Sequence, residues 1–121
     1  MNALLCGTAC MFSAYVLPPI EYDKPFLDGP LFVTRAITKG ELRKLCNLSK
    51  PGLDLGCAWL KPTYCQIIMA PDQDIAAAGY VPSLVFRHER GHCNRWPDEH
   101  PGSRVPTAAD WKAPLSKFYQ E

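Results

Sequence analysis

Three histidines and one glutamate in a short stretch are the residues of this chain best suited to chemistry. His88 and His92 are four residues apart, so on a helix both imidazoles lie on one face and can point to one position. Glu89 lies one step around that helix, within reach of a water molecule at the same position. In this HExxH pattern the two imidazoles bind Zn²⁺ and the glutamate acts as a general base. The remaining histidine, His100, follows eight residues after His92.

The third protein ligand of such a metal site has two candidates. We favour His100, because imidazole is a commoner zinc ligand than carboxylate and no other histidine remains in the chain. Asp98 is the alternative; if His100 binds the metal, Asp98 could accept a hydrogen bond from a ligand N–H instead. Three protein ligands would leave a fourth position open to water, which is the arrangement of catalytic zinc sites.

The helix that must carry the two spaced histidines has recognisable ends. Pro82 suits the first helical turn, where its missing N–H is not needed. We expect the helix to end at Asn94 in a left-handed conformation, just before Trp96 and Pro97. Gly91 is unfavourable inside a helix, and it predicts a close approach of the backbone to a neighbouring strand or to the metal.

The remaining elements are predicted to be short and separated by loops, because the chain contains 12 Pro and 8 Gly. Together they predict an α+β fold, in which a short antiparallel or mixed sheet packs on the histidine-bearing helix. The predicted elements are a strand over residues 31–37, a helix opened by a Thr38–Glu41 capping box, strands over 57–60 and 65–69, and a helix over 107–112.

Length and charge limit the domain organisation and the partners. A chain of 121 residues builds one domain, predicted here over residues 18–121. Residues 1–17 are apolar and uncharged, and they are either an incomplete export signal or an apolar N-terminal segment. A net charge of +1 gives no reason to expect nucleic acid as a partner. No apolar run is long enough for a transmembrane span, and nothing indicates an oligomeric state.

Six cysteines are many for a chain of this length, and they favour an oxidising location, periplasmic or secreted. No two of them have the CxxC spacing of a thiolate metal site. Disulfides are therefore the favoured state of the four cysteines in the body of the chain. Three pairings remain open among Cys46, Cys57, Cys65 and Cys93.

The run HERGHCNRWPD resembles the active-site helix of the zincin metallopeptidases. Within that group it is similar to the metzincin pattern HExxHxxGxxH/D, which the snapalysin-type secreted proteases end in Asp. His88, Glu89 and His92 match this pattern. The resemblance implies a zincin-like fold, a bound Zn²⁺ and a peptide or protein substrate that adds as an extended strand to a sheet edge; the strand over residues 65–69 is the candidate edge.

One position departs from the metzincin pattern. The turn glycine that follows the helix in that family falls at Arg95 in this chain. A residue with a side chain is disfavoured in the left-handed conformation, so we expect the left-handed turn to move to Asn94. Asp98 lies in register with the last ligand of the pattern, which keeps it a candidate beside His100.

These observations predict a zinc-dependent peptidase in which Glu89 activates a water molecule at the metal. An alternative is a structural zinc-binding interaction module of the cell envelope or secreted space, in which Glu89 has no catalytic role. A further alternative is a disulfide-stabilised secreted binding domain that holds no metal. Metal content and the effect of replacing Glu89 would separate the three.

Overall fold

The computed structural model of the chain describes residues 15–48 and 54–119, which form the predicted small α+β domain. The apolar segment predicted for the N-terminus lies outside the described residues over positions 1–14. The strands and helices of the described part are β1 (Leu31–Arg35), α2 (Lys39–Leu45), β2 (Gly56–Leu60), β3 (Cys65–Met69), α3 (Asp72–Ala77), α4 (Pro82–Cys93), α5 (Ala108–Lys112) and the 3₁₀ turn η1 (Leu115–Lys117).

The three strands form a mixed sheet in the order β1-β3-β2, in which β3 is parallel to β1 and antiparallel to β2. The expectation that residues 65–69 form the sheet edge is therefore wrong, because β3 is the central strand. Its run Cys-Gln-Ile-Ile-Met is largely buried, as is typical of a strand covered on both faces. The edge nearest α4 is formed by β2 instead, which contacts α4 closely.

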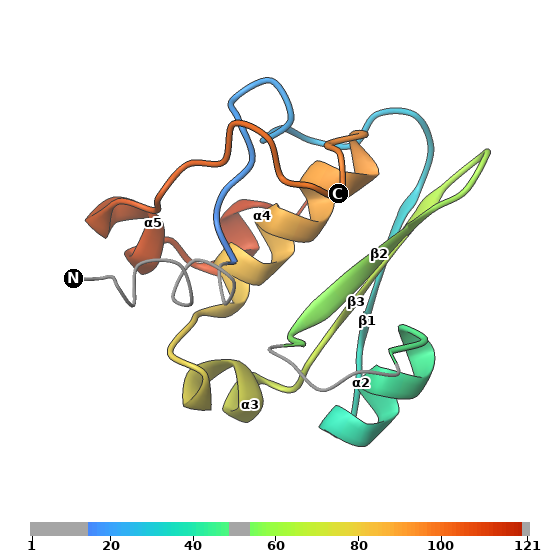
Figure 1. Cartoon of the computed structure of the whole chain (residues 1–121), viewed down its shortest axis with the longest axis vertical. Helices are drawn as coiled ribbons and strands as arrows, with labels where there is room; N and C mark the ends of the chain where they lie inside the picture. Colours follow the sequence, from blue (N-terminus) through green and yellow to red (C-terminus); the bar gives the residue numbers. More distant parts are fainter. Residues whose placement is uncertain (1–14, 49–53, 120–121) are drawn as a thin grey trace.

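Helix α4 crosses one face of the sheet. Residues 15–24 and the C-terminal tail lie on the side of α4 that faces away from the sheet (Figure 1). The helix begins with Pro82 at its first turn, as predicted, and ten of its twelve side chains are buried. A helix so enclosed is positioned by packing along its whole length. The histidines on it are consequently held in fixed directions.

The C-terminal end of α4 differs from the sequence-based prediction. The left-handed residue is Arg95, with φ 77°, while Asn94 has φ −86°. Trp96 N donates to Gly91 O at 2.9 Å and Arg95 N donates to His92 O at 3.0 Å, the two hydrogen bonds of a Schellman motif. This motif requires the left-handed residue one position after the cap. The turn thus stays where the metzincin pattern has its glycine.

Arg95→Gly is expected to raise the free energy of unfolding by about 0.5–1 kcal/mol. Glycine removes the strain of a side chain at positive φ, and this gain is partly offset by the greater freedom of glycine in the unfolded chain. Asn94→Gly is the matched control: its amide donates to the carbonyls of Tyr22 and Lys24, so its loss should lower stability. Urea denaturation of both variants tests this; a stabilised Asn94→Gly with a destabilised Arg95→Gly would contradict it.

Gly91 permits a close approach, but the neighbour is neither a strand nor the metal position. A Cβ at Gly91 would lie 2.8 Å from Cγ of Pro18 and 3.1 Å from Cε3 of Trp96. Both neighbours are fully or almost fully buried rings that cannot move aside easily. The N-terminal segment therefore rests directly on the backbone of α4.

Residues 15–17, assigned by sequence to the N-terminal segment, pack with the rest of the domain. Leu17 is completely buried and exchanges two backbone hydrogen bonds with Arg104, of 2.9 and 2.8 Å. Tyr15 is 8% exposed and belongs to the hydrophobic core. The packed domain therefore includes residues before the predicted boundary at residue 18.

Two disulfides tie these elements together, as the cysteine content predicted. Cys46, at the end of α2, bonds to Cys57 of β2, and Cys65 of β3 bonds to Cys93 at the end of α4. Two disulfides in one small domain fit an extracellular location. Within the described part of the chain, no helix is both long and apolar enough to cross a membrane.

Candidate metal centre

The imidazoles of His88, His92 and His100 converge on one point. Nε2 of His100 lies 3.2 Å from Nε2 of His92 and 3.2 Å from Nε2 of His88. Tetrahedral zinc with Zn–N distances of about 2.0–2.1 Å spaces its ligand nitrogens by roughly 3.3 Å. The three histidines therefore lie close enough to hold one metal ion.

Two of the imidazoles are oriented by backbone carbonyl groups on their outer side. Nδ1 of His88 is 2.8 Å from the carbonyl oxygen of Val16, and Nδ1 of His92 is 2.8 Å from that of Trp96. A carbonyl oxygen only accepts, so each Nδ1 must carry the proton and each Nε2 must present its lone pair inward. Orientation of a ligand imidazole through its second nitrogen is the usual support of a metal site.

The indole of Trp96 forms the floor beneath the three imidazoles. It stacks on His92 with ring centroids 4.9 Å apart and contacts the edges of His88 and His100. Trp96 is 2% exposed, and its Nε1 donates to the carbonyl oxygen of Pro101 at 2.8 Å. The contacts of Trp96 hold the loop after α4 against the helix.

His100 reaches the cluster from that loop through a tight turn. Its N–H donates to Pro97 O at 3.0 Å, and its φ of 62° lies in the left-handed region. Backbone strain of this kind persists only where surrounding contacts impose it, and it is concentrated at functional sites. The loop therefore presents His100 inward at a cost in local conformational energy.

Asp98, the alternative third ligand, lies on the outside of this arrangement. Its carboxylate is 3.8 Å from Nδ1 of His92, the nitrogen that faces away from the other imidazoles, and its side chain is almost fully exposed. The structure thus brings His100, and not Asp98, together with His88 and His92. The carboxylate of Asp98 is beyond hydrogen-bond distance of that nitrogen, whose proton is donated to Trp96 O instead.

Burial favours the neutral form of the His88 and His100 imidazoles. It lowers the pKa of His88 to about 3 and also lowers the pKa of His100, in each case against the protonated form. The neighbouring imidazoles act in the same direction. Neutral imidazole is the form that binds a metal, so at pH 7 these two residues need not lose a proton first.

Glu89 is buried beside the three histidines, within a cleft of about 430 Å³. Burial, followed by the charge of Asp98, raises the pKa of Glu89 to about 8 in the metal-free protein. A divalent cation at the imidazoles would favour the carboxylate and lower this pKa. A glutamate in this setting is suited to accept and later release a proton near neutral pH.

The cleft extends from the three histidines to β2, the strand at one edge of the sheet. Gly56 and Ala58 of β2 line it together with the Cys46–Cys57 disulfide and with Trp59, which also packs against the hydrophobic core. Its acidic lining residues are Glu89 and Asp98. An extended molecule lying along β2 would therefore pass directly over Glu89 and the imidazoles.

Comparison of the chain with known protein families, curated proteins and solved structures finds no match. The resemblance to the metzincins accordingly remains one of local sequence, confined to the helix and the turn that follows it. The chemical argument about this site is made from its own residues.

Sequence reasoning missed two residues of the site. Val16 orients His88 through its carbonyl oxygen, which no side-chain pattern could have indicated. The ring of Tyr15 lies 4.8 Å from that of His88, while its hydroxyl contacts the start of β2. The only signal is a tyrosine next to a valine at the end of an apolar run, which the sequence alone leaves as either an incomplete export signal or an apolar N-terminal segment.

Proposed function

We propose that this protein is a zinc-dependent peptidase. The observation that carries the proposal is the convergence of three imidazole nitrogens beside a buried glutamate, in a cleft bordered by a free strand edge. Three neutral nitrogen donors suit Zn²⁺ and leave a fourth position for water. His88, His92 and His100 would hold the ion. The two disulfides are consistent with a periplasmic or secreted enzyme.

The proposed reaction assigns a separate task to each group of residues. Bound zinc would supply Lewis acidity toward a peptide carbonyl and a water molecule. Glu89 accepts the proton of the attacking water and passes it to the departing amine. Trp96 and the carbonyl group of Val16 keep the imidazoles from rotating, while the edge of β2 aligns the peptide.

Metal content is the test of the site. Protein purified without chelator is expected to contain one zinc per chain by mass spectrometry, and His100→Ala is expected to lose or greatly weaken it. Asp98→Ala is the matched variant and should retain the metal, because its exposed carboxylate is 3.8 Å from Nδ1 of His92 and makes no hydrogen bond to the imidazole. Zinc that is retained by His100→Ala and lost from Asp98→Ala would make Asp98 the third ligand. Wild type that binds no zinc after zinc is added back would exclude the metal site.

A second candidate function is a structural zinc-binding interaction module without turnover. It is favoured by the way the cluster joins α4 to the loop after it, since His100 comes from that loop and His88 is bound to the N-terminal segment. A structural ion would contribute directly to folding. In that case Glu89→Gln would change no measurable property, whereas His88→Ala would unfold the protein.

A further inference from the structure

The register of the hairpin determines which backbone groups of β2 face the cleft. Lys61 N donates to Tyr64 O at 2.8 Å at one end, and Ala70 N donates to Leu55 O at 2.9 Å at the other. The pairing between these two points has no break in register. In an antiparallel pair, successive residues point their N–H and C=O groups alternately toward and away from the partner. Cys57 and Trp59 therefore direct their backbone groups toward β3, between the bonds that Leu55 O and Lys61 N make to the residues flanking β3.

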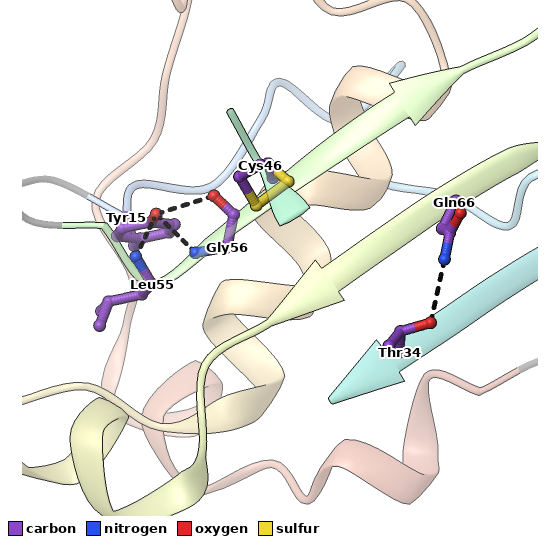
Figure 2. The surroundings of a disulfide bond; sticks show 7 residues. Tyr15, Thr34, Cys46, Leu55, Gly56 and Gln66 are labelled. Carbon is purple, nitrogen blue, oxygen red and sulfur yellow. Dashed lines mark hydrogen bonds between the residues drawn. A yellow bond between two sulfur atoms is a disulfide. The ribbon is translucent and has the colours of Figure 1, made fainter. Parts of the chain in front are cut away.

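The even-numbered residues Gly56, Ala58 and Leu60 direct their backbone groups to the free edge. The hydroxyl of Tyr15 occupies this edge at Gly56: it accepts from Gly56 N at 3.1 Å and donates to Gly56 O at 3.4 Å (Figure 2). It also accepts from Leu55 N at 2.9 Å. Within residues 15–48 and 54–119, the edge groups of Ala58 and Leu60 have no hydrogen-bond partner.

Tyr15 is held firmly in this position. Its ring lies against the rings of His88 and Tyr80, with centroids 4.8 and 5.8 Å away. A phenol hydroxyl both donates and accepts, and here it does both at once toward the backbone of β2. The phenol thus supplies to Gly56 the same donor and acceptor pair that a neighbouring strand would supply.

We infer that Tyr15 is a specificity-determining residue that ends the peptide-binding edge, so that an extended peptide pairs with Ala58 and Leu60 and no further. This deepens the proposed peptidase function and rests on it. In antiparallel pairing, a peptide residue opposite Ala58 makes two hydrogen bonds, and the residue two positions toward the peptide N-terminus pairs with Leu60. The residue two positions toward the C-terminus would meet Gly56, which Tyr15 already holds. Recognition along β2 is thereby confined to the N-terminal side of the bound peptide.

Amide hydrogen exchange followed by NMR tests this pairing. The probe is an N-acetylated, C-amidated hexapeptide of alternating Val and Thr, added to zinc-loaded Glu89→Gln protein so that it stays intact. At saturation, the amides of Ala58 and Leu60 are expected to exchange about tenfold more slowly, because each gains one hydrogen bond to the peptide. The amide of Gly56 and those of the odd-numbered residues of β2 should be unchanged, since they already have partners.

Tyr15→Phe in the same background is the decisive variant, because it keeps the ring against His88 and removes only the hydroxyl. The amide of Gly56 should then exchange about tenfold faster in the free protein and become protected when the hexapeptide binds. The peptide should gain roughly twofold to tenfold in affinity from the newly available groups of Gly56. Tyr64→Phe is the control, since no hydrogen bond of its hydroxyl occurs in the described part of the chain.

Two results would overturn the inference: failure of the hexapeptide at millimolar concentration to protect Ala58 and Leu60, or an unchanged exchange rate of Gly56 in Tyr15→Phe. Neither depends on turnover. If wild-type protein cleaves no peptide while Ala58 and Leu60 become protected, the peptidase function fails and the binding edge stands. If wild-type protein cleaves peptides without this protection, the peptidase function stands and the role of Tyr15 fails.

Discussion

Glu89→Gln is expected to lower the rate of peptide hydrolysis by roughly 10²–10⁴-fold, the contribution of a positioned general base. The variant should keep its zinc, because the three ligand nitrogens all belong to histidines. It should also keep its fold. Burial raises the pKa of Glu89 to about 8, so the metal-free protein holds this side chain protonated at pH 7, and glutamine resembles that neutral form. Hydrolysis of a mixed peptide library and zinc content are the two measurements.

Glu99→Gln is the matched control for this experiment. Glu99 is an exposed side chain on the same loop as His100 but outside the cleft lining, and Glu99→Gln makes the same chemical replacement there. Its hydrolysis rate should stay within about twofold of wild type, as expected for an exposed surface position. Equal activity in Glu89→Gln and wild type would remove Glu89 from the reaction and favour the structural zinc module.

The local features of this fold could be predicted from sequence because they depend on few neighbouring residues. The spacing of His88 and His92 placed both on one helical face, and Pro82 marked the start of that helix. The Thr38–Glu41 pair opened a helix as expected, since both of its hydrogen bonds lie within four residues. Each of these predictions needs only helix geometry and the hydrogen bonding of a single turn.

Features that depend on distant segments could not be predicted in this way. The central place of β3 follows from strand order, which the sequence of one strand does not specify. Arg95 takes the left-handed conformation because the Schellman bonds and the buried Trp96 outweigh its own preference. The roles of Tyr15 and Val16 arise from contacts across more than 40 and 70 residues of chain, respectively. Every residue has a backbone carbonyl group, so the sequence does not indicate which carbonyl group contacts a histidine.

A second large effect is expected from Asp23→Asn, on the side of α4 away from the metal centre. The Asp23 carboxylate accepts from Arg87 at 2.5 Å, from Arg90 at 3.3 Å and from Arg104 at 2.6 Å. Asp23, Arg87 and Arg90 are each less than a tenth exposed. Removing the carboxylate that the three guanidinium groups share leaves the buried Arg90 without a carboxylate partner among the described residues and leaves Arg87 with Asp110 alone. We therefore expect a loss of about 3–5 kcal/mol in unfolding free energy.

Lowering the pH of the wild-type protein should cause part of the same loss of unfolding free energy. Burial alone would raise the pKa of Asp23, but hydrogen bonds from Arg87 and Arg104 outweigh it, so the pKa is lowered. Backbone and side-chain hydrogen bonds likewise lower the pKa of Asp110, which also pairs with Arg87, to about 2. A carboxyl group with a lowered folded-state pKa stabilises the protein fully above its unfolded value of about 4, and this stabilisation disappears as pH falls through the folded value. Wild type should therefore lose stability between about pH 4 and pH 2.

The Asp23→Asn variant distinguishes the contribution of Asp23 to the pH dependence of stability from the contributions of the other acidic residues. In Asp23→Asn the fall in stability between about pH 4 and pH 2 should be shallower, because the proton that Asp23 would take up is no longer part of the unfolding equilibrium. Asp28→Asn, at an exposed turn where the described residues provide no hydrogen bond or ion pair, should keep the wild-type slope. Denaturant midpoints measured across this range for the three proteins give the comparison. An unchanged slope in Asp23→Asn would mean that Asp23 does not couple protonation to stability, and that the packing of the N-terminal segment on α4 rests on Pro18 and Leu17 instead.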